Sequence, residues 1–214
     1  MIVAARAADE ALSRASAWEI VGGLSEPSKM PAYSYGLPAK ECRVGSKLVG
    51  VPGSVCHGCY ALKGNYRFNN VQRAQYRRLE SLTHPRWTEA MIHLMHAIDM
   101  RHFRWHDSGD IQSPTHLANI VAVAQASPQV RFWLPTREKV FVSSHLKRHG
   151  AFPENLVVRL SATMVDGPPP AGFAHTSTVV TSGASCPAPL QNNACGTCRA
   201  CWDPEVQNVS YKKH

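Results

Sequence analysis

The alternation of short apolar strands with helices in residues 87–180 constrains the fold of this chain more than any other feature. Four segments have strand character and each ends in small or polar residues, at 102–106, 130–134, 156–160 and 177–180. The segments between them carry apolar residues at helical spacing, such as Leu117, Ile120 and Val121. Because each crossover helix returns the chain to the same end of a sheet, this alternation predicts an α/β fold with a parallel sheet.

The other expected elements precede this region. Apolar residues predict helices over 71–82 and 87–98, and a short strand is expected at 32–37. There are too few units for an eight-stranded barrel. We therefore expect a partial (β/α) barrel or an open parallel sheet, with irregular cysteine-bearing loops at the C-terminal face of the strands. This single domain would span residues 29–214, after an N-terminal arm or helix in residues 1–28. Residues 18–60 show no helical period, and the tail from Cys186 is expected to be irregular.

The formal charge of +8 at pH 7 raises the question of nucleic-acid binding. The basic residues are spread along the sequence, however, and a [4Fe–4S] cluster with four thiolates would add about −2. Nucleic acid is therefore kept only as a minor alternative. No apolar run is long enough to span a bilayer, so no membrane association is expected. Residues 1–17 lack the apolar core of a secretory signal, which favours the cytoplasm, where thiols stay reduced.

The seven cysteines form two groups. Their odd number and the absence of a signal segment argue against a disulfide framework. The second group combines a C-x2-C-x2-C run with a distant Cys-Pro pair, the two pieces that bacterial ferredoxins use for iron–sulfur clusters. This pattern predicts a cluster, most simply [4Fe–4S], with zinc as the alternative. The predicted ligands of this group are Cys186, Cys195, Cys198 and Cys201.

The first group offers three thiolates, Cys42, Cys56 and Cys59. Three ligands on a [4Fe–4S] cluster leave one iron open for water or a substrate. Thirteen residues separate the first cysteine from the second, and the loop between them would have to fold back. Three kinds of ligand set remain possible: one of the two groups alone, both groups, or the first group with one tail cysteine. One or two clusters per chain are therefore expected.

Polar residues at strand ends are the other candidate site residues. His106, Asp107 and Asp110 follow one predicted strand and are candidates for proton transfer or substrate contact, with ordinary turn formation as the alternative. Weaker candidates for cofactor contact end the later strands: Arg137, Arg159 and Ser161. The sequence contains no Walker loop, dinucleotide-binding glycine motif or serine-hydrolase elbow.

Several separated stretches together resemble a bacteriophage family, the one named for gene product eighty-eight. They are MPAYSY at 30–35, CHGCYA at 56–61, WHDSGD at 105–110, CRACWD at 198–203 and NVSY at 208–211. The resemblance implies a phage protein with an iron–sulfur cluster. The CHGCYA stretch is also similar to phage proteins distantly related to radical S-adenosylmethionine enzymes, although this chain lacks their C-x3-C-x2-C motif.

The functional hypothesis is an iron–sulfur protein acting in redox chemistry or electron transfer in the host cytoplasm. One alternative is an enzyme that binds a cosubstrate, such as S-adenosylmethionine, at an open cluster iron. The other is a zinc-stabilised nucleic-acid-binding module. The sequence predicts neither a redox partner, nor a small-molecule substrate, nor an oligomeric state.

Overall fold

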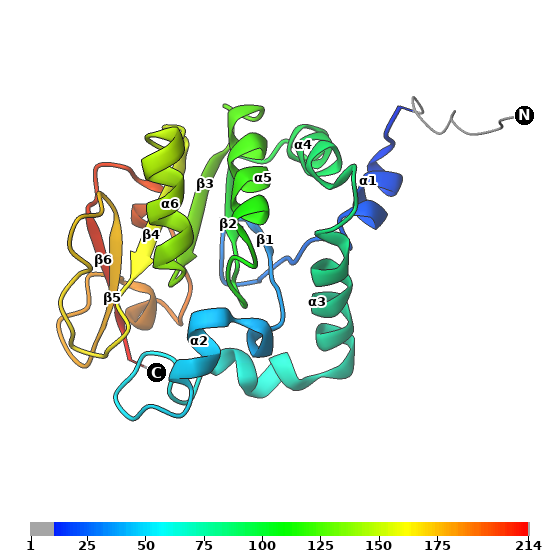
Figure 1. The fold of residues 1–214 in the computed structure, drawn as a ribbon. Helices are drawn as coiled ribbons and strands as arrows, with labels where there is room; N and C mark the ends of the chain where they lie inside the picture. Colours follow the sequence, from blue (N-terminus) through cyan, green and yellow to red (C-terminus); the bar gives the residue numbers. More distant parts are fainter. Residues whose placement is uncertain (1–10, 214) are drawn as a thin grey trace, which may run out of the picture.

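The computed structural model describes residues 11–213, so most of the predicted N-terminal arm up to residue 10 lies outside the described residues. Its strands form one six-stranded, all-parallel sheet in the order β1-β2-β3-β4-β5-β6 (Figure 1). β1 and β6 are the two edges, so the sheet is open, and the predicted α/β class with a parallel sheet is confirmed. The strands are β1 (Tyr33–Tyr35), β2 (His102–Trp105), β3 (Arg131–Thr136), β4 (Leu156–Ser161), β5 (Thr176–Val180) and β6 (Asn208–Lys212).

Helices fill the connections in the first part of the sheet. In Figure 1, α5 and α6 lie in front of the sheet, and α1, α3 and α4 lie beyond its β1 edge. The predicted helices are confirmed, and Ser113 caps α5 by accepting the His116 N–H. The helices are α1 (Arg14–Ile20), α2 (Arg43–Leu48), α3 (Asn69–Ser81), α4 (Trp87–Ala97), α5 (Pro114–Gln125) and α6 (Lys139–His149).

The prediction of no helix in residues 18–60 was wrong for α2. This helix is short, has only one buried residue, Gly45, and has no side-chain cap of its own. A buried carboxylate from a distant segment supplies the missing cap, because Oε1 of Glu138 accepts the Val44 N–H at 2.9 Å. Local sequence therefore gives no periodic signal for α2, and a tertiary contact helps to hold it.

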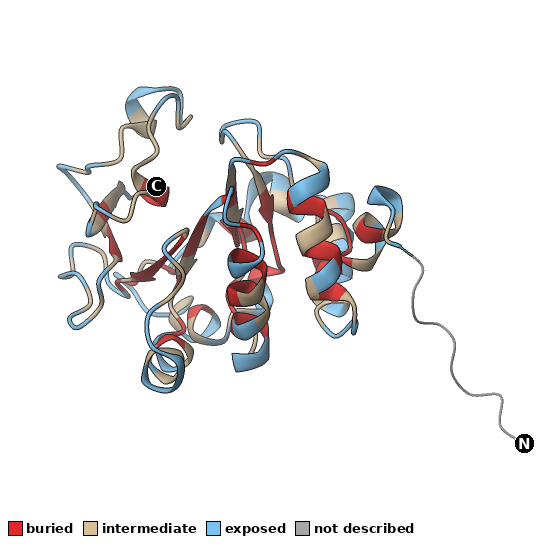
Figure 2. Ribbon diagram, turned by 90° about the horizontal axis from the view of Figure 1, so that it is seen from above, coloured by how far each residue is buried: buried red, intermediate tan, exposed pale blue. Residues whose placement is uncertain are grey.

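The main core lies between the helices and the strands β1 to β4. Trp87, Trp105 and Phe103 are completely buried within it, and Tyr35 donates its hydroxyl to the backbone carbonyl of Val21. Burial of large aromatic rings contributes much of the apolar stabilisation of such a core. Figure 2 shows buried residues concentrated in the strands and on the inner helix faces.

A second, smaller core joins the tail to β3. Trp133, Cys201, Trp202 and Val209 form it, with Cys186 among the half-buried residues packed against it. The expectation of an irregular tail was wrong for β6, which pairs in parallel register with β5 along residues 208–212. The sequence of β6 has only two apolar side chains facing this core, which is too few to produce a clear strand pattern.

The loops that follow the strands gather at one edge of the sheet, because all strands are parallel. The loop after β1 carries the first three cysteines and meets the loop after β4. Val55 N–H bonds the Thr163 carbonyl at 2.8 Å, and Val165 N–H bonds the Gly53 carbonyl at 2.9 Å. These two hydrogen bonds fix the cysteine loop across the strand ends.

Candidate functional site

A cavity of about 290 Å³ lies at the C-terminal edge of the sheet. The loops after β1, β2, β3 and β4 supply most of its walls, together with the ends of β5 and β6. The charged and thiol side chains that line it are Cys42, Cys56, His57, Cys59, Arg104, His106, Asp107, Asp110, Arg137, Lys212 and Lys213. The edge where parallel sheets place their sites therefore holds a cavity with both acidic and basic groups.

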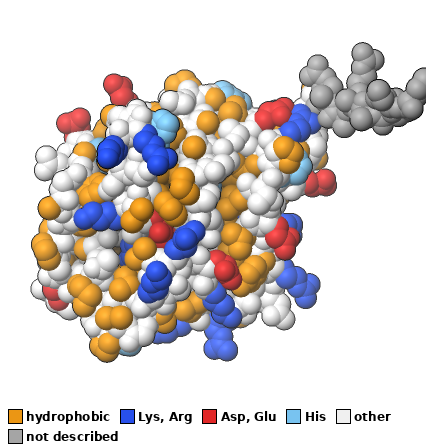
Figure 3. Space-filling view, in the orientation of Figure 1, with side chains coloured by type: hydrophobic (Ala, Val, Ile, Leu, Met, Phe, Trp, Pro, Cys, Tyr) orange, Lys and Arg blue, Asp and Glu red, His pale blue; other side chains and the backbone are white. Residues whose placement is uncertain are grey.

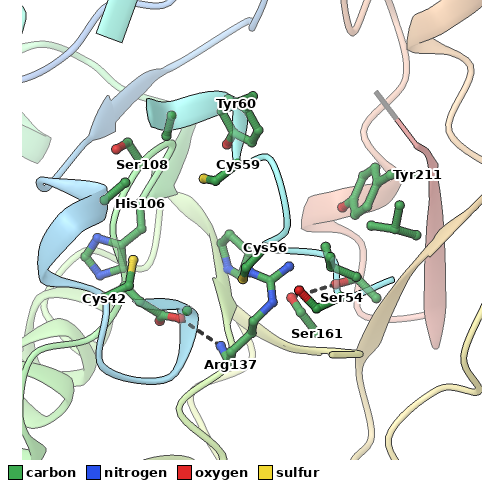
Figure 4. Close-up of a pocket in the computed structure, with 18 of the residues that line it drawn as sticks. Cys42, Ser54, Cys56, Cys59, Tyr60, His106, Ser108, Arg137, Ser161 and Tyr211 are labelled. Carbon is green, nitrogen blue, oxygen red and sulfur yellow. Dashed lines mark hydrogen bonds between the residues drawn. The ribbon is translucent and has the colours of Figure 1, made fainter. Parts of the chain in front are cut away.

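Three thiols converge on this cavity. In Figure 4 the side chains of Cys42, Cys56 and Cys59 surround the same space, although thirteen residues separate the first from the second. All seven cysteines of the chain are free thiols in the structure. The loop between Cys42 and Cys56 folds back through α2, which answers the geometric question that the sequence left open.

A glycine keeps the space beside two of these sulfur atoms clear. A Cβ at Gly45 would lie 3.0 Å from Cys42 Cβ, 3.5 Å from Cys56 Sγ and 3.6 Å from Cys42 Sγ. A Cβ here would crowd Cys42 Cβ and lie in van der Waals contact with both sulfur atoms, so Gly45 leaves open the space beside the two thiols.

Burial opposes ionisation of the thiols of Cys42 and Cys56. Burial raises the pKa of Cys42 to about 12, and the carboxylate of Asp110 and the thiols of Cys59 and Cys56 add to the effect. Burial also raises the pKa of Cys56, whereas the neighbouring guanidinium of Arg137 lowers it. A bound cation or cationic cluster would favour the thiolate forms, because metal ligation replaces the thiol protons.

Arg137, a predicted cofactor contact, lines the cavity beside the thiols (Figure 4). Its backbone N–H donates to Oδ2 of Asp110 at 2.9 Å. Its side-chain Nε is buried and has no hydrogen-bond partner within residues 11–213. A buried guanidinium N–H without an acceptor is costly, so this group is suited to an anionic ligand in the cavity.

The three catalytic candidates after β2 also reach the cavity, and each is buried. Burial lowers the pKa of His106 to about 3, so its ring is neutral at pH 7. Nδ1 of His106 lies 3.2 Å from the Tyr35 carbonyl oxygen, and Nε2 has no partner among the described residues. Because its low pKa makes the ring a weak base, a role for His106 in proton transfer remains a prediction.

The two carboxylates have structural partners. Asp107 accepts the Ser34 hydroxyl at 2.7 Å and the Tyr66 hydroxyl at 3.2 Å. Asp110 accepts the Thr136 hydroxyl at 2.6 Å besides the Arg137 N–H. The pKa of Asp110 is raised to about 6 because burial, which raises it, outweighs these hydrogen bonds, which lower it. The two side chains tie β1 and β3 to the end of β2, and their catalytic roles remain predictions.

The remaining weak candidates occupy different places. Ser161 lines the cavity, and its Oγ lies 2.9 Å from Ser177 Oγ. Arg159 is completely buried away from the cavity lining, and its guanidinium donates to backbone carbonyls of the tail, including Ala200 and Val206, each at 2.8 Å. The partners that the structure gives Arg159 are carbonyl oxygens, and its predicted cofactor contact remains a prediction.

The four tail cysteines form a separate group outside the cavity lining. Burial raises the pKa of Cys195, and the nearby thiols of Cys186 and Cys198 contribute. Burial raises the pKa of Cys201 to about 11, and Cys186 again contributes. The tail cysteines are thus neighbours of one another, and the two predicted groups are distinct in space.

Sequence reasoning missed several residues of the cavity wall, notably Arg104 and Tyr211. The guanidinium of Arg104 lies over the Trp133 ring at 4.4 Å. Tyr60 also lines the cavity, and its hydroxyl donates to the Asp107 carbonyl at 2.6 Å. Arg104 occupies a strand position between apolar residues, a pattern that it shares with Arg159. Tyr211 gave no such signal because β6 was not recognised.

Comparison with known proteins identifies the family. The model of the Gene product 88 family matches residues 5–171. The chain belongs to this family of phage gene products. The Gene product 88 match includes Cys42, Cys56 and Cys59 but ends before the four tail cysteines. No curated protein and no solved structure matches the chain.

Three further observations bear on the alternatives. Within residues 11–213, no group of three or more His, Cys, Asp or Glu side chains has the arrangement to hold a metal ion. No helix in this part of the chain is long and apolar enough to cross a membrane. Figure 3 shows Lys and Arg side chains spaced over the visible face and interspersed with acidic ones. This face has no continuous basic surface of the kind that nucleic-acid-binding proteins present.

Proposed function

We propose that this Gene product 88 protein binds an iron–sulfur cluster through Cys42, Cys56 and Cys59 and acts in redox chemistry. The observation that carries the proposal is the convergence of these three free thiols on one cavity at the strand ends. Thiolate sulfur is the ligand that iron–sulfur clusters require. The three cysteines also lie within the segment that the family model matches.

The surroundings of the three thiols fit such a cluster. Gly45 leaves room beside two of the sulfur atoms, and the unpartnered Nε of Arg137 supplies a hydrogen-bond donor and positive charge nearby. Ligands of a cluster lie farther apart than ligands of one ion, because iron and sulfide atoms stand between them. The described residues contain no arrangement that would hold a single ion, and this argues against mononuclear zinc more strongly than against a cluster.

When bound, such a cluster supplies one-electron chemistry at a potential set by charge, hydrogen bonds and burial. The protein's own part follows from its residues. Arg137 places positive charge beside the thiols, and the apolar and aromatic walls restrict the access of water.

The cavity favours a second candidate function, that of an enzyme using an open cluster iron. Three protein ligands leave one iron of a [4Fe–4S] cluster without a thiolate, and a cavity of about 290 Å³ has room for part of a cosubstrate. Reduced protein incubated with S-adenosylmethionine tests this candidate. Reductive cleavage that is lost in Cys42→Ser supports it. A reducible cluster that leaves S-adenosylmethionine intact would exclude this cosubstrate.

Iron and acid-labile sulfide analysis of anaerobically purified variants tests the main proposal. Cys56→Ser removes one ligand and is expected to lose the iron bound at the cavity. Lys47→Arg is the matched control, because Lys47 is exposed on α2 in the same loop and does not line the cavity. Equal iron and sulfide in wild type and Cys56→Ser, with the control unchanged, would refute the proposed ligand set.

A further inference from the structure

The connection between β5 and β6 carries four cysteines that the cavity does not use. Residues 181–207 contain only two short turns of 3₁₀ helix, Ala188–Leu190 and Ala200–Trp202. We call its cysteines the tail cysteine group: Cys186, Cys195, Cys198 and Cys201. A segment of this length without helix or strand has few backbone hydrogen bonds of its own, so other contacts must hold it in place.

Backbone contacts fix the members of the tail cysteine group in place. Cys186 N–H bonds the Ser210 carbonyl of β6 at 2.9 Å, and Cys195 N–H bonds the Lys29 carbonyl at 3.0 Å. Cys198 N–H bonds the Cys195 carbonyl at 3.0 Å, which closes a tight turn between these two. The segment that carries these cysteines is therefore anchored to β6 and to the chain before β1.

The thiols of the group also lie near one another. Cys186 and Cys201 pack in the same small core beside Trp133 and Trp202. Cys195 has Cys186 and Cys198 as its thiol neighbours. Four free thiols from a span of residues 186–201 are thus gathered without a disulfide.

Positive charge surrounds this group. Arg104 is a neighbour of both Cys195 and Cys201, and Arg199 is a neighbour of Cys195. Nε of Arg159 donates to the Cys201 carbonyl at 3.1 Å, and Arg199 donates to the Cys198 carbonyl at 2.8 Å. A [4Fe–4S] cluster held by four thiolates has a net charge of about −2, which such a shell of guanidinium groups would stabilise.

We propose that the tail cysteine group holds a second iron–sulfur cluster, separate from the one proposed at the cavity. The C-x2-C-x2-C run supplies three ligands, and Cys186 supplies the fourth. Each of the four iron atoms would then have a thiolate ligand. The group lies beyond the residues that the family model matches, so it adds a centre to the part of the fold that defines the family.

The second centre borders the cavity. Cys201 Sγ lies 3.2 Å from the Tyr211 hydroxyl, and Tyr211 and Arg104 both line the cavity. The centre also links Cys186, near β6, to the segment of residues 195–201, which stabilises the long connection in the way that structural metal sites do.

Metal analysis of the full-length protein, prepared without oxygen, tests this inference. Wild type is expected to contain about eight iron and eight sulfide per chain, and about four of each in the double variant Cys195→Ser/Cys198→Ser. Thr197→Ser is the matched control, because Thr197 is exposed between the two cysteines. Iron and sulfide that are unchanged in the double variant, or zinc in place of iron, would overturn the inference.

The same series separates this inference from the proposed function. Loss of all iron in the tail variant, with Cys56→Ser unchanged, would leave the second centre standing and refute the first. The opposite result would refute the second centre alone. A reductive titration of the wild-type protein counts the clusters without any variant, so it tests the inference even if a variant fails to fold. Uptake of about two electrons per chain supports two clusters, and uptake of about one contradicts them.

Discussion

At the scale of the residue, His106 has both an unusual backbone conformation and a buried ring. Its φ of 58° lies in the left-handed region, which non-glycine residues seldom adopt and Asn adopts most readily among them. Its ring stacks edge-on to His116, with ring centroids 5.2 Å apart. Both rings are buried, and burial lowers the pKa of each.

The depressed pKa of His106 predicts a pH-dependent stability. The unfolded chain binds a proton near pH 6.5 that the folded protein does not bind until about pH 3. This contribution to stability is complete above pH 6.5 and is lost as the pH falls toward 3. His106→Asn should therefore flatten the dependence by up to about 1.4 kcal/mol per pH unit. Urea unfolding of metal-free protein between pH 4 and pH 7 measures it, and an unchanged slope would contradict the prediction.

Gly45 gives a second prediction at this scale. Gly45→Ala adds a methyl group in contact with Cys42 Cβ and near both sulfur atoms, while Ala favours the helix by about 1 kcal/mol over Gly. We expect folding stability to change by less than about 1 kcal/mol, with a severalfold loss of iron affinity at the cavity. Gly50→Ala is the control, because a Cβ there meets no neighbour. Iron retention by both variants would show that Gly45 does not shape the site.

At the scale of the element, Arg159 of β4 organises the tail. Besides Ala200 and Val206, its guanidinium donates to the carbonyls of Cys201 and Asp203, and the residue is completely buried. The tail loop lacks a backbone ladder of its own, and Arg159 donates to all four of these carbonyls. Those of Ala200 and Asp203 each accept one backbone N–H as well. Arg159 thereby positions the loop that carries Cys198 and Cys201.

Arg159→Lys should be strongly destabilising. An ammonium group has three donors on one atom and cannot span the carbonyls that the planar guanidinium reaches. Each buried acceptor left unsatisfied costs about 1–3 kcal/mol, so we expect a loss of roughly 3 kcal/mol or more. Arg148→Lys, at an exposed site on α6, should change the free energy of unfolding by less than about 0.5 kcal/mol. Similar unfolding midpoints for the two variants would contradict this role.

The elements also show what the sequence can and cannot predict. Helices α3 to α6 and strands β1 to β4 follow from apolar spacing, because their apolar side chains pack in or against the main core. Strand β5 was also predicted, although its buried side chains, Thr176, Ser177 and Thr178, are polar. α2 and β6 were missed because contacts from distant segments stabilise them, namely Glu138 on α2 and β5 beside β6. Strand-end residues such as Arg137 were predictable from their position, whereas Tyr211 depended on recognising β6.

At the scale of the whole molecule, the open parallel sheet brings seven cysteines into two neighbouring places. The loop after β1 delivers three to the cavity, and the connection before β6 carries four that lie outside the cavity lining. Arg104 lines the cavity, lies over the Trp133 ring and is a neighbour of Cys195 and Cys201. The formal charge of +8 is of the sign that would balance the anionic clusters that we propose.

Anomalous diffraction at the iron edge, from crystals grown without oxygen, tests the central claim most directly. The account predicts an iron peak in the strand-end cavity, in contact with the sulfur atoms of Cys42, Cys56 and Cys59. A cavity without iron, or with two of these sulfurs joined in a disulfide, would contradict it.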